Sequence, residues 1–94
     1  MIIYEIEAKI EEGLAGSFEI YMNERHIRDL LETDFFESAE MTEASVGVYR
    51  IKYRCQSRHI LDEYFATRAD ELRQDFISHF PSGVELRRRI YERD

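Results

Sequence analysis

The chain has 94 residues, of which 44% are hydrophobic and 35% are charged, and its net charge at pH 7 is −7. These values predict one domain over residues 1–94 and exclude an intrinsically disordered chain. The acidic balance argues against binding to nucleic acid or to an anionic membrane, and no apolar run is long enough to span a bilayer. The single cysteine and the lack of a signal-peptide pattern lead us to expect a cytoplasmic protein.

A strand is predicted over residues 2–10, because apolar and polar side chains alternate strictly there. The spacing then becomes helical and predicts a helix over about residues 15–32. Its inward stripe is expected to be Leu14, Phe18, Tyr21, Met22, His26 and Leu30, widened by Ile20, Ile27 and Leu31. Phe35 and Phe36, which follow an exit turn, are predicted to pack back on the core.

Two further strands follow this helix. Residues 37–42 alternate poorly, as short edge strands do, and a turn is predicted over residues 43–46. Residues 47–55 alternate clearly, with Tyr49, Ile51, Tyr53 and Cys55 on one face. We therefore expect the fourth element to be a well-packed strand and the third to lie at the sheet edge.

A second helix is expected from Ser57, its predicted N-cap, to Phe80, where Pro81 and Gly83 end it. Its inward stripe is expected to comprise Leu61, Phe65, Ala69, Leu72, Phe76 and Phe80. The last strand is predicted over residues 84–91. The order β-α-β-β-α-β is typical of the α+β ferredoxin-like sandwich, a four-stranded antiparallel sheet with two helices on one face. The expected strand order is 4-1-3-2.

The other sheet face should be uncovered and carry an ordered set of charges, called the charge ladder below. Its members are Glu5 and Glu7 on the first strand, Arg50, Lys52 and Arg54 on the third, and Arg87 and Arg89 on the fourth. The ladder is interpreted either as a solvated, self-neutralised face or as the interface of a homodimer. An RNA-binding face is disfavoured, because stacking aromatics are lacking except for Tyr91 and the two glutamates would repel phosphate.

Several segments together resemble a known family. They are residues 1–5, the helical run from Phe18 to Leu31, the strand Tyr49–Arg54, the helical pattern from Leu61 to Arg73, and the closing run from Phe80 to Arg89. In order and spacing they are similar to a bacterial family catalogued as a domain of unknown function, number 4286. Where the family has Pro-Gly before Phe36 this chain has Asp34 and Phe35, and where it has a proline after Ala69 this chain has Asp70.

The resemblance implies the dimeric α/β-barrel clan, in which ferredoxin-like domains pair through their sheets. That clan includes cofactor-independent monooxygenases of the antibiotic-biosynthesis type and some haem-degrading enzymes. The family itself has no established activity. The resemblance therefore implies a fold and a homodimer rather than a reaction.

No motif for catalysis, phosphate binding or metal binding is present, so we predict no cofactor and no metal site. His26, His59 and His79 lack metal-ligand spacing. His26, on the apolar side of its helix, is either a core histidine with one hydrogen bond or a general base. Inward-facing Tyr4, Tyr49 and Tyr53, with Tyr21 and Tyr64, either fill the core or line an aromatic pocket.

Arg88 shares the inward phase of the last strand, where an arginine needs a partner. It either extends to water or pairs with a helix carboxylate, or it holds a ligand carboxylate together with Arg73. Cys55 is expected to be a packed thiol.

Two function classes remain open. One is a non-enzymatic dimeric module that binds a small molecule or a protein partner. The other is a monooxygenase-like enzyme in which His26, Tyr49 and Tyr53 handle the proton and Arg73 or Arg88 holds an anion. A cavity of a few hundred cubic ångströms at His26 would favour the enzyme, and a filled core would oppose it.

Overall fold

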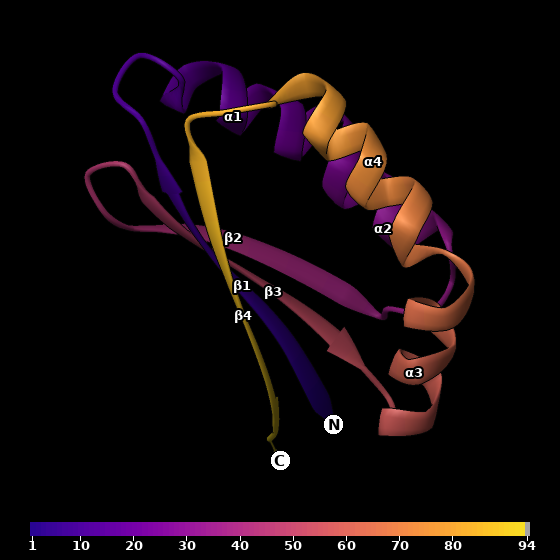
Figure 1. The fold of residues 1–94 in the computed structure, drawn as a ribbon. Helices are drawn as coiled ribbons and strands as arrows, with labels where there is room; N and C mark the ends of the chain where they lie inside the picture. Colours follow the sequence, from indigo (N-terminus) through magenta and orange to yellow (C-terminus); the bar gives the residue numbers. More distant parts are fainter. Residues whose placement is uncertain (94) are drawn as a thin grey trace.

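The computed structural model describes residues 1–93. The elements follow the predicted order (Figure 1). They are β1 (Ile2–Ile10), α1 (Ala15–Tyr21), η1 (Met22–His26), α2 (Ile27–Glu32), β2 (Ser38–Ser45), β3 (Val48–Cys55), α3 (Arg58–Thr67), α4 (Ala69–His79) and β4 (Val84–Glu92). All four strands form one antiparallel sheet in the order β2-β3-β1-β4, which confirms both the ferredoxin-like fold and the predicted strand order.

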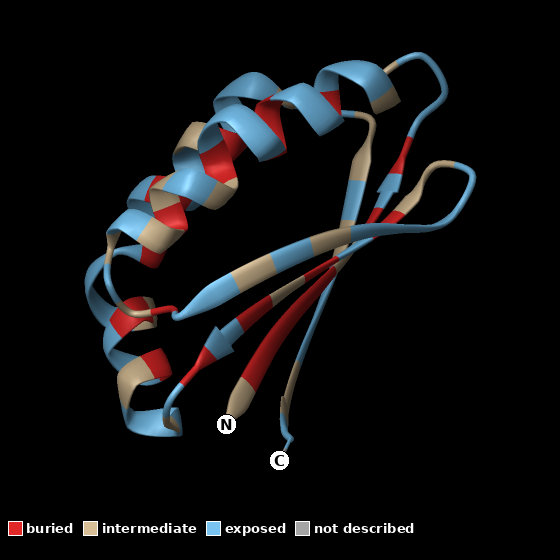
Figure 2. Cartoon of the chain, turned by 180° about the vertical axis from the view of Figure 1, so that it is seen from behind, coloured by how far each residue is buried: buried red, intermediate tan, exposed pale blue. Residues whose placement is uncertain are grey.

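The helices cover one face of the sheet and leave the other uncovered (Figures 1 and 2). Side chains buried between the two layers come from the inward positions of β1 and β3 and from the stripes of the helices. The predicted stripe of the first helix is confirmed, except that Ile20 is 60% exposed and lies outside the core. Phe36 is buried and Phe35 is partly buried against the core, so the predicted packing of these two residues is confirmed.

The first helix is continuous through α1, η1 and α2, and η1 is a π-helical turn. The sequence pattern predicted the extent of this helix but not its wider turn. Residues five apart lie on different faces of a regular α-helix, whereas a π turn brings them together. The rings of Tyr21 and His26 accordingly stack with their centroids 5.7 Å apart.

The second helix differs from the prediction, because Arg68 leaves the helical conformation (φ −127°) and separates α3 from α4. A single regular helix with Leu61 and Leu72 inward would also bury Arg68. The break changes the phase instead, so that Ala69 is buried and Arg68 is exposed. The N-cap is as predicted, since Ser57 Oγ accepts a hydrogen bond from the Ile60 amide at 3.2 Å.

The strand β2 runs three residues beyond its predicted end, and the turn into β3 lies at Val46 and Gly47 rather than over residues 43–46. Gly47 adopts a φ of +75°, which glycine tolerates without a steric penalty, and its carbonyl accepts a hydrogen bond from the Ile10 amide at 2.7 Å. The hairpin is thereby tied to the end of β1.

Candidate functional site

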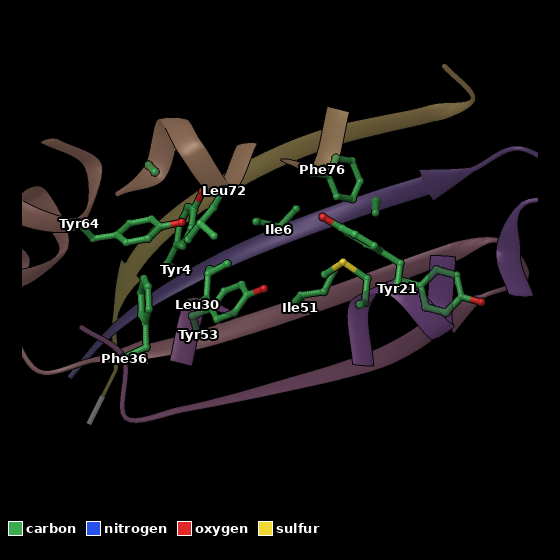
Figure 3. Packing of buried hydrophobic residues seen from close by; sticks show 14 of the residues in the cluster. Tyr4, Ile6, Tyr21, Leu30, Phe36, Ile51, Tyr53, Tyr64, Leu72 and Phe76 are labelled. Atoms are coloured by element: carbon green, nitrogen blue, oxygen red, sulfur yellow. The ribbon is translucent and has the colours of Figure 1, made fainter. Parts of the chain in front are cut away.

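A small cavity lies between the helices and the inward face of the sheet. Its volume open to the centre of a water molecule is about 40 Å³, and most of its lining is apolar. The lining residues are Tyr4, Ile6, Ala8, Phe18, Met22, His26, Leu30, Ile51, Tyr64, Ala69, Arg73, Phe76, Leu86 and Arg88. Figure 3 shows how several of these side chains pack between the layers. The core is therefore neither completely filled nor hollow on the scale of a few hundred cubic ångströms.

Two arginines from different elements, Arg73 on α4 and Arg88 on β4, line this cavity and also reach the surface. Arg88 lies opposite Ile6 in the β1–β4 register, which places it on the helix-covered side as predicted. Its Nε donates to the hydroxyl oxygen of Tyr4 at 3.1 Å, so its partner is a tyrosine rather than a helix carboxylate. Among residues 1–93, the ion-pair partner of Arg73 is Asp70 at a loose 3.6 Å, and the Asp70 side chain is 94% exposed.

Tyr64 lines the same cavity as both arginines. Burial raises the pKa of Tyr64, while the charges of Arg73 and Arg88 act to lower it. The Tyr64 and Tyr4 rings also neighbour each other, with their centroids 6.4 Å apart. Because the Tyr4 oxygen accepts from Arg88, its own hydrogen is available to donate. Two guanidinium groups and two phenol groups thus line one cavity, and Arg88 is hydrogen-bonded to Tyr4 within it.

His26 lines the same cavity from η1 and is 8% exposed. Its Nδ1 lies 3.5 Å from the hydroxyl of Tyr21. Burial lowers the pKa of His26 to about 4, an effect that outweighs the opposing charges of Asp29 and Asp75, so the imidazole is neutral at pH 7. This environment corresponds to the first of the two interpretations of His26, a core histidine with one hydrogen bond.

Asp75, which no sequence motif singled out, joins this group from α4. Its carboxylate accepts a hydrogen bond from the Tyr21 hydroxyl at 2.7 Å and pairs with Arg25 at 2.6 Å. The Tyr21 hydrogen bond and the Arg25 charge hold the pKa of Asp75 below its usual range despite partial burial. The contact joins residues 54 positions apart, so no local spacing could have indicated it.

Other predicted site residues lie elsewhere. Tyr49 and Tyr53 are buried in the core but do not line the cavity. Burial raises the pKa of Tyr49 to about 12, and burial also raises the pKa of Tyr53 well above its ordinary value. Cys55 is a fully buried thiol whose Sγ contacts the Ser57 carbonyl at 3.4 Å, and burial raises its pKa. Within residues 1–93 no cluster of three metal-ligating side chains is found.

The charge ladder lies on the uncovered sheet face in the predicted arrangement. In the register, Glu5 is opposite Lys52 and Arg89, and Glu7 is opposite Arg50 and Arg87. Glu5 contacts Arg89 at 3.1 Å and Lys52 at 4.0 Å, and its Oε1 accepts from the Tyr91 hydroxyl at 3.1 Å. These partners cover Glu5 to 6% exposure although no helix lies above it. Arg54, the remaining basic member of the ladder, lies opposite Ile3 and Ser38 in the strand register, and neither of these residues is acidic.

No helix within the described residues is both long and apolar enough to cross a membrane.

Solved structures share this fold at low sequence identity. A candidate antibiotic biosynthesis monooxygenase from Deinococcus radiodurans matches with a TM-score of 0.69 and 14% identity, over 100% of this chain and 93% of its own. An ethyl tert-butyl ether D family protein from Bacillus halodurans matches with a TM-score of 0.67 and 13% sequence identity, over 100% of both chains. Rv0793 from Mycobacterium tuberculosis matches with a TM-score of 0.64 and 17% sequence identity, over 99% of this chain and 95% of its own.

Among curated proteins, none matches this chain significantly in sequence. The family model described as "Domain of unknown function (DUF4286)" matches residues 1–93, which is nearly the whole sequence. The chain therefore belongs to this family, as its segments indicated, and it has the ferredoxin-like fold of monooxygenase-type structures.

Proposed function

We propose that this protein is a homodimeric module that binds a small organic anion, with a carboxylate as the anionic group. The observation that carries the proposal is the convergence of Arg73, Arg88, Tyr4 and Tyr64 on one apolar cavity. Guanidinium groups recognise carboxylates through charge-assisted hydrogen bonds, and phenol O–H groups add further donors. The apolar lining suits a short carbon chain that enters behind the carboxylate.

The cavity volume limits the size of the ligand. About 40 Å³ accommodates one or two water molecules or a few carbon atoms, far less than a drug-sized ligand needs. A fitting ligand therefore keeps its carboxylate at the partly exposed arginines and buries only a short tail. Short alkanoates such as acetate, propionate and butyrate are suitable probes.

Neutralising both arginines is expected to abolish binding of these probes. Each charge-assisted hydrogen bond lost costs about 1.5–3 kcal/mol, which corresponds to roughly 10- to 100-fold in affinity. The measurement is an NMR titration of the wild type, Arg73→Gln, Arg88→Gln and the double variant with propionate.

Arg87→Gln is the matched control, because Arg87 neighbours Arg88 in the chain but belongs to the uncovered face. It should bind as the wild type does. No saturable binding of any short carboxylate to the wild type, or equal weakening by Arg87→Gln and Arg88→Gln, would refute the anion site.

The charge ladder supports the dimer. Each uncovered face has acidic residues on β1 between basic residues on β3 and β4, so two copies related by a twofold axis can place basic flanks against acidic centres. Native mass spectrometry at micromolar concentration is expected to show twice the 11.3 kDa chain mass. Glu7→Arg should lower the dimer fraction, and a wild-type protein that is monomeric under these conditions would contradict the proposed assembly.

A monooxygenase-like enzyme is the second candidate. The neutral imidazole of His26 at the cavity supports it, because such a group can accept a proton. The small volume of the cavity favours the binding module over the enzyme. Uptake of oxygen by the protein saturated with a bound acid would favour the enzyme over the binding module. No uptake would leave the binding module as the favoured function.

A further inference from the structure

A chain of polar groups connects His26 to the surface of the helical layer. The Tyr21 hydroxyl lies 3.5 Å from His26 Nδ1 and 2.7 Å from Asp75 Oδ2, and Arg25 binds the other oxygen of Asp75 at 2.6 Å. The π turn brings Tyr21 and His26 onto one side of the first helix, and α4 supplies Asp75. The arrangement therefore depends on two packed elements rather than on one loop.

The hydrogens of this chain can be assigned from the chemistry of the groups. Tyr21 has a single hydroxyl hydrogen, and the ionised carboxylate of Asp75 can only accept, so the short 2.7 Å bond takes that hydrogen. The Tyr21 oxygen can then only accept from His26. A hydrogen bond across this 3.5 Å contact therefore requires the neutral imidazole to carry its proton on Nδ1, which leaves the lone pair on Nε2.

We propose that His26 Nε2 is a hydrogen-bond acceptor for the ligand, and that the ligand is a short carboxylic acid carrying an O–H or N–H group, such as a hydroxy acid. The inference rests on the proposed anion site, because Arg73 and Arg88 hold the carboxylate. His26 lines the same cavity, and Nε2 is the ring nitrogen that Tyr21 does not engage. Tyr21 and Asp75 act as positioning residues that set the tautomer.

The tautomer can be measured without any ligand. In water, neutral histidine carries its proton mainly on Nε2, so an Nδ1–H form indicates a specific partner at Nδ1. Long-range proton–nitrogen correlation spectra of the ¹⁵N-labelled protein at pH 7 are expected to show protonated Nδ1 and unprotonated Nε2 for His26. In Tyr21→Phe the proton should return to Nε2. A wild-type protein with its proton on Nε2 overturns the proposal.

Ligand selectivity gives the second test. Matched pairs of equal chain length are titrated: acetate with glycolate, propionate with 3-hydroxypropionate, and butyrate with 4-hydroxybutyrate. For at least one length, the hydroxy acid is expected to bind about fivefold tighter, the value of one hydrogen bond of about 1 kcal/mol. His26→Phe, which keeps an aromatic ring but removes the acceptor, should abolish this preference.

The outcomes separate the two proposals. If alkanoates bind through Arg73 and Arg88 but no hydroxy acid binds more tightly, the role of His26 is refuted and the anion site stands. If no carboxylate of either series binds, both proposals fail. Should His26→Phe not fold, the wild-type selectivity and the wild-type tautomer still decide the matter.

Discussion

Acidification from pH 7 to pH 4 is expected to lower the free energy of unfolding by about 3 kcal/mol through His26 alone. The pKa of His26 falls from 6.5 in the unfolded chain to about 4 in the fold, mainly because of burial. Each pKa unit corresponds to about 1.4 kcal/mol. Between these two pH values the unfolded chain binds a proton that the folded protein does not, so stability is full above pH 6.5 and declines as the pH falls toward 4.

Denaturant unfolding at pH 7, 6, 5 and 4 measures this effect. His26→Gln should flatten the decline within that window, because glutamine keeps a polar side chain but does not titrate. His59→Gln is the control: the His59 side chain is 83% exposed, and its substitution should leave the decline unchanged. If His26→Gln retained the wild-type pH dependence, the assignment of a buried neutral imidazole would be wrong.

Phe18→Ala is expected to destabilise the protein by about 3–5 kcal/mol, the usual cost of truncating a buried phenylalanine. Phe18 is completely buried and packs against Tyr49, Phe76 and Phe80, with ring centroids 5.1, 6.3 and 6.0 Å away. It joins the first helix to β3 and to the end of α4. Since whole domains are stable by only about 5–15 kcal/mol, this loss would leave the variant marginal at 25 °C.

Ile20→Ala is the matched control for this variant. Ile20 lies two residues further along the same helix, and both substitutions introduce the same good helix former. Because Ile20 is 60% exposed, its truncation should change the free energy of unfolding by no more than about 0.5 kcal/mol. Comparable losses in the two variants would show that Phe18 and Ile20 do not differ in burial as this structure places them.

Tyr53 has a buried hydroxyl whose lack of a hydrogen-bond partner within residues 1–93 the sequence pattern could not reveal. Its ring was predicted to face inward and does so, yet its hydroxyl is buried without a hydrogen-bond partner among the described residues. Whether a buried hydroxyl finds a partner depends on which side chains reach it from other elements. By contrast, the hydroxyl of Tyr4 accepts a hydrogen bond from Arg88, and the hydroxyl of Tyr21 donates one to Asp75.

The sequence by itself determined the elements and most of the strand pattern. Alternation in β1 and β3 identified the buried faces, because the two-residue period of a strand is a local property of the backbone. The order of the elements then predicted the sheet order, since few unknotted topologies accommodate it. The charge ladder followed from these two facts, and the inward phase of Arg88 followed from the β4 pattern.

Only the tertiary structure decided the features that depend on packing between distant elements. The π turn at His26, the break at Arg68 and the exposure of Ile20 were not indicated by the spacing of apolar residues. The Tyr21–Asp75 hydrogen bond and the cavity shared by His26, Arg73 and Arg88 join residues from separate elements. Periodicity specifies which face of an element is buried, but contacts across the core depend on how those faces fit together.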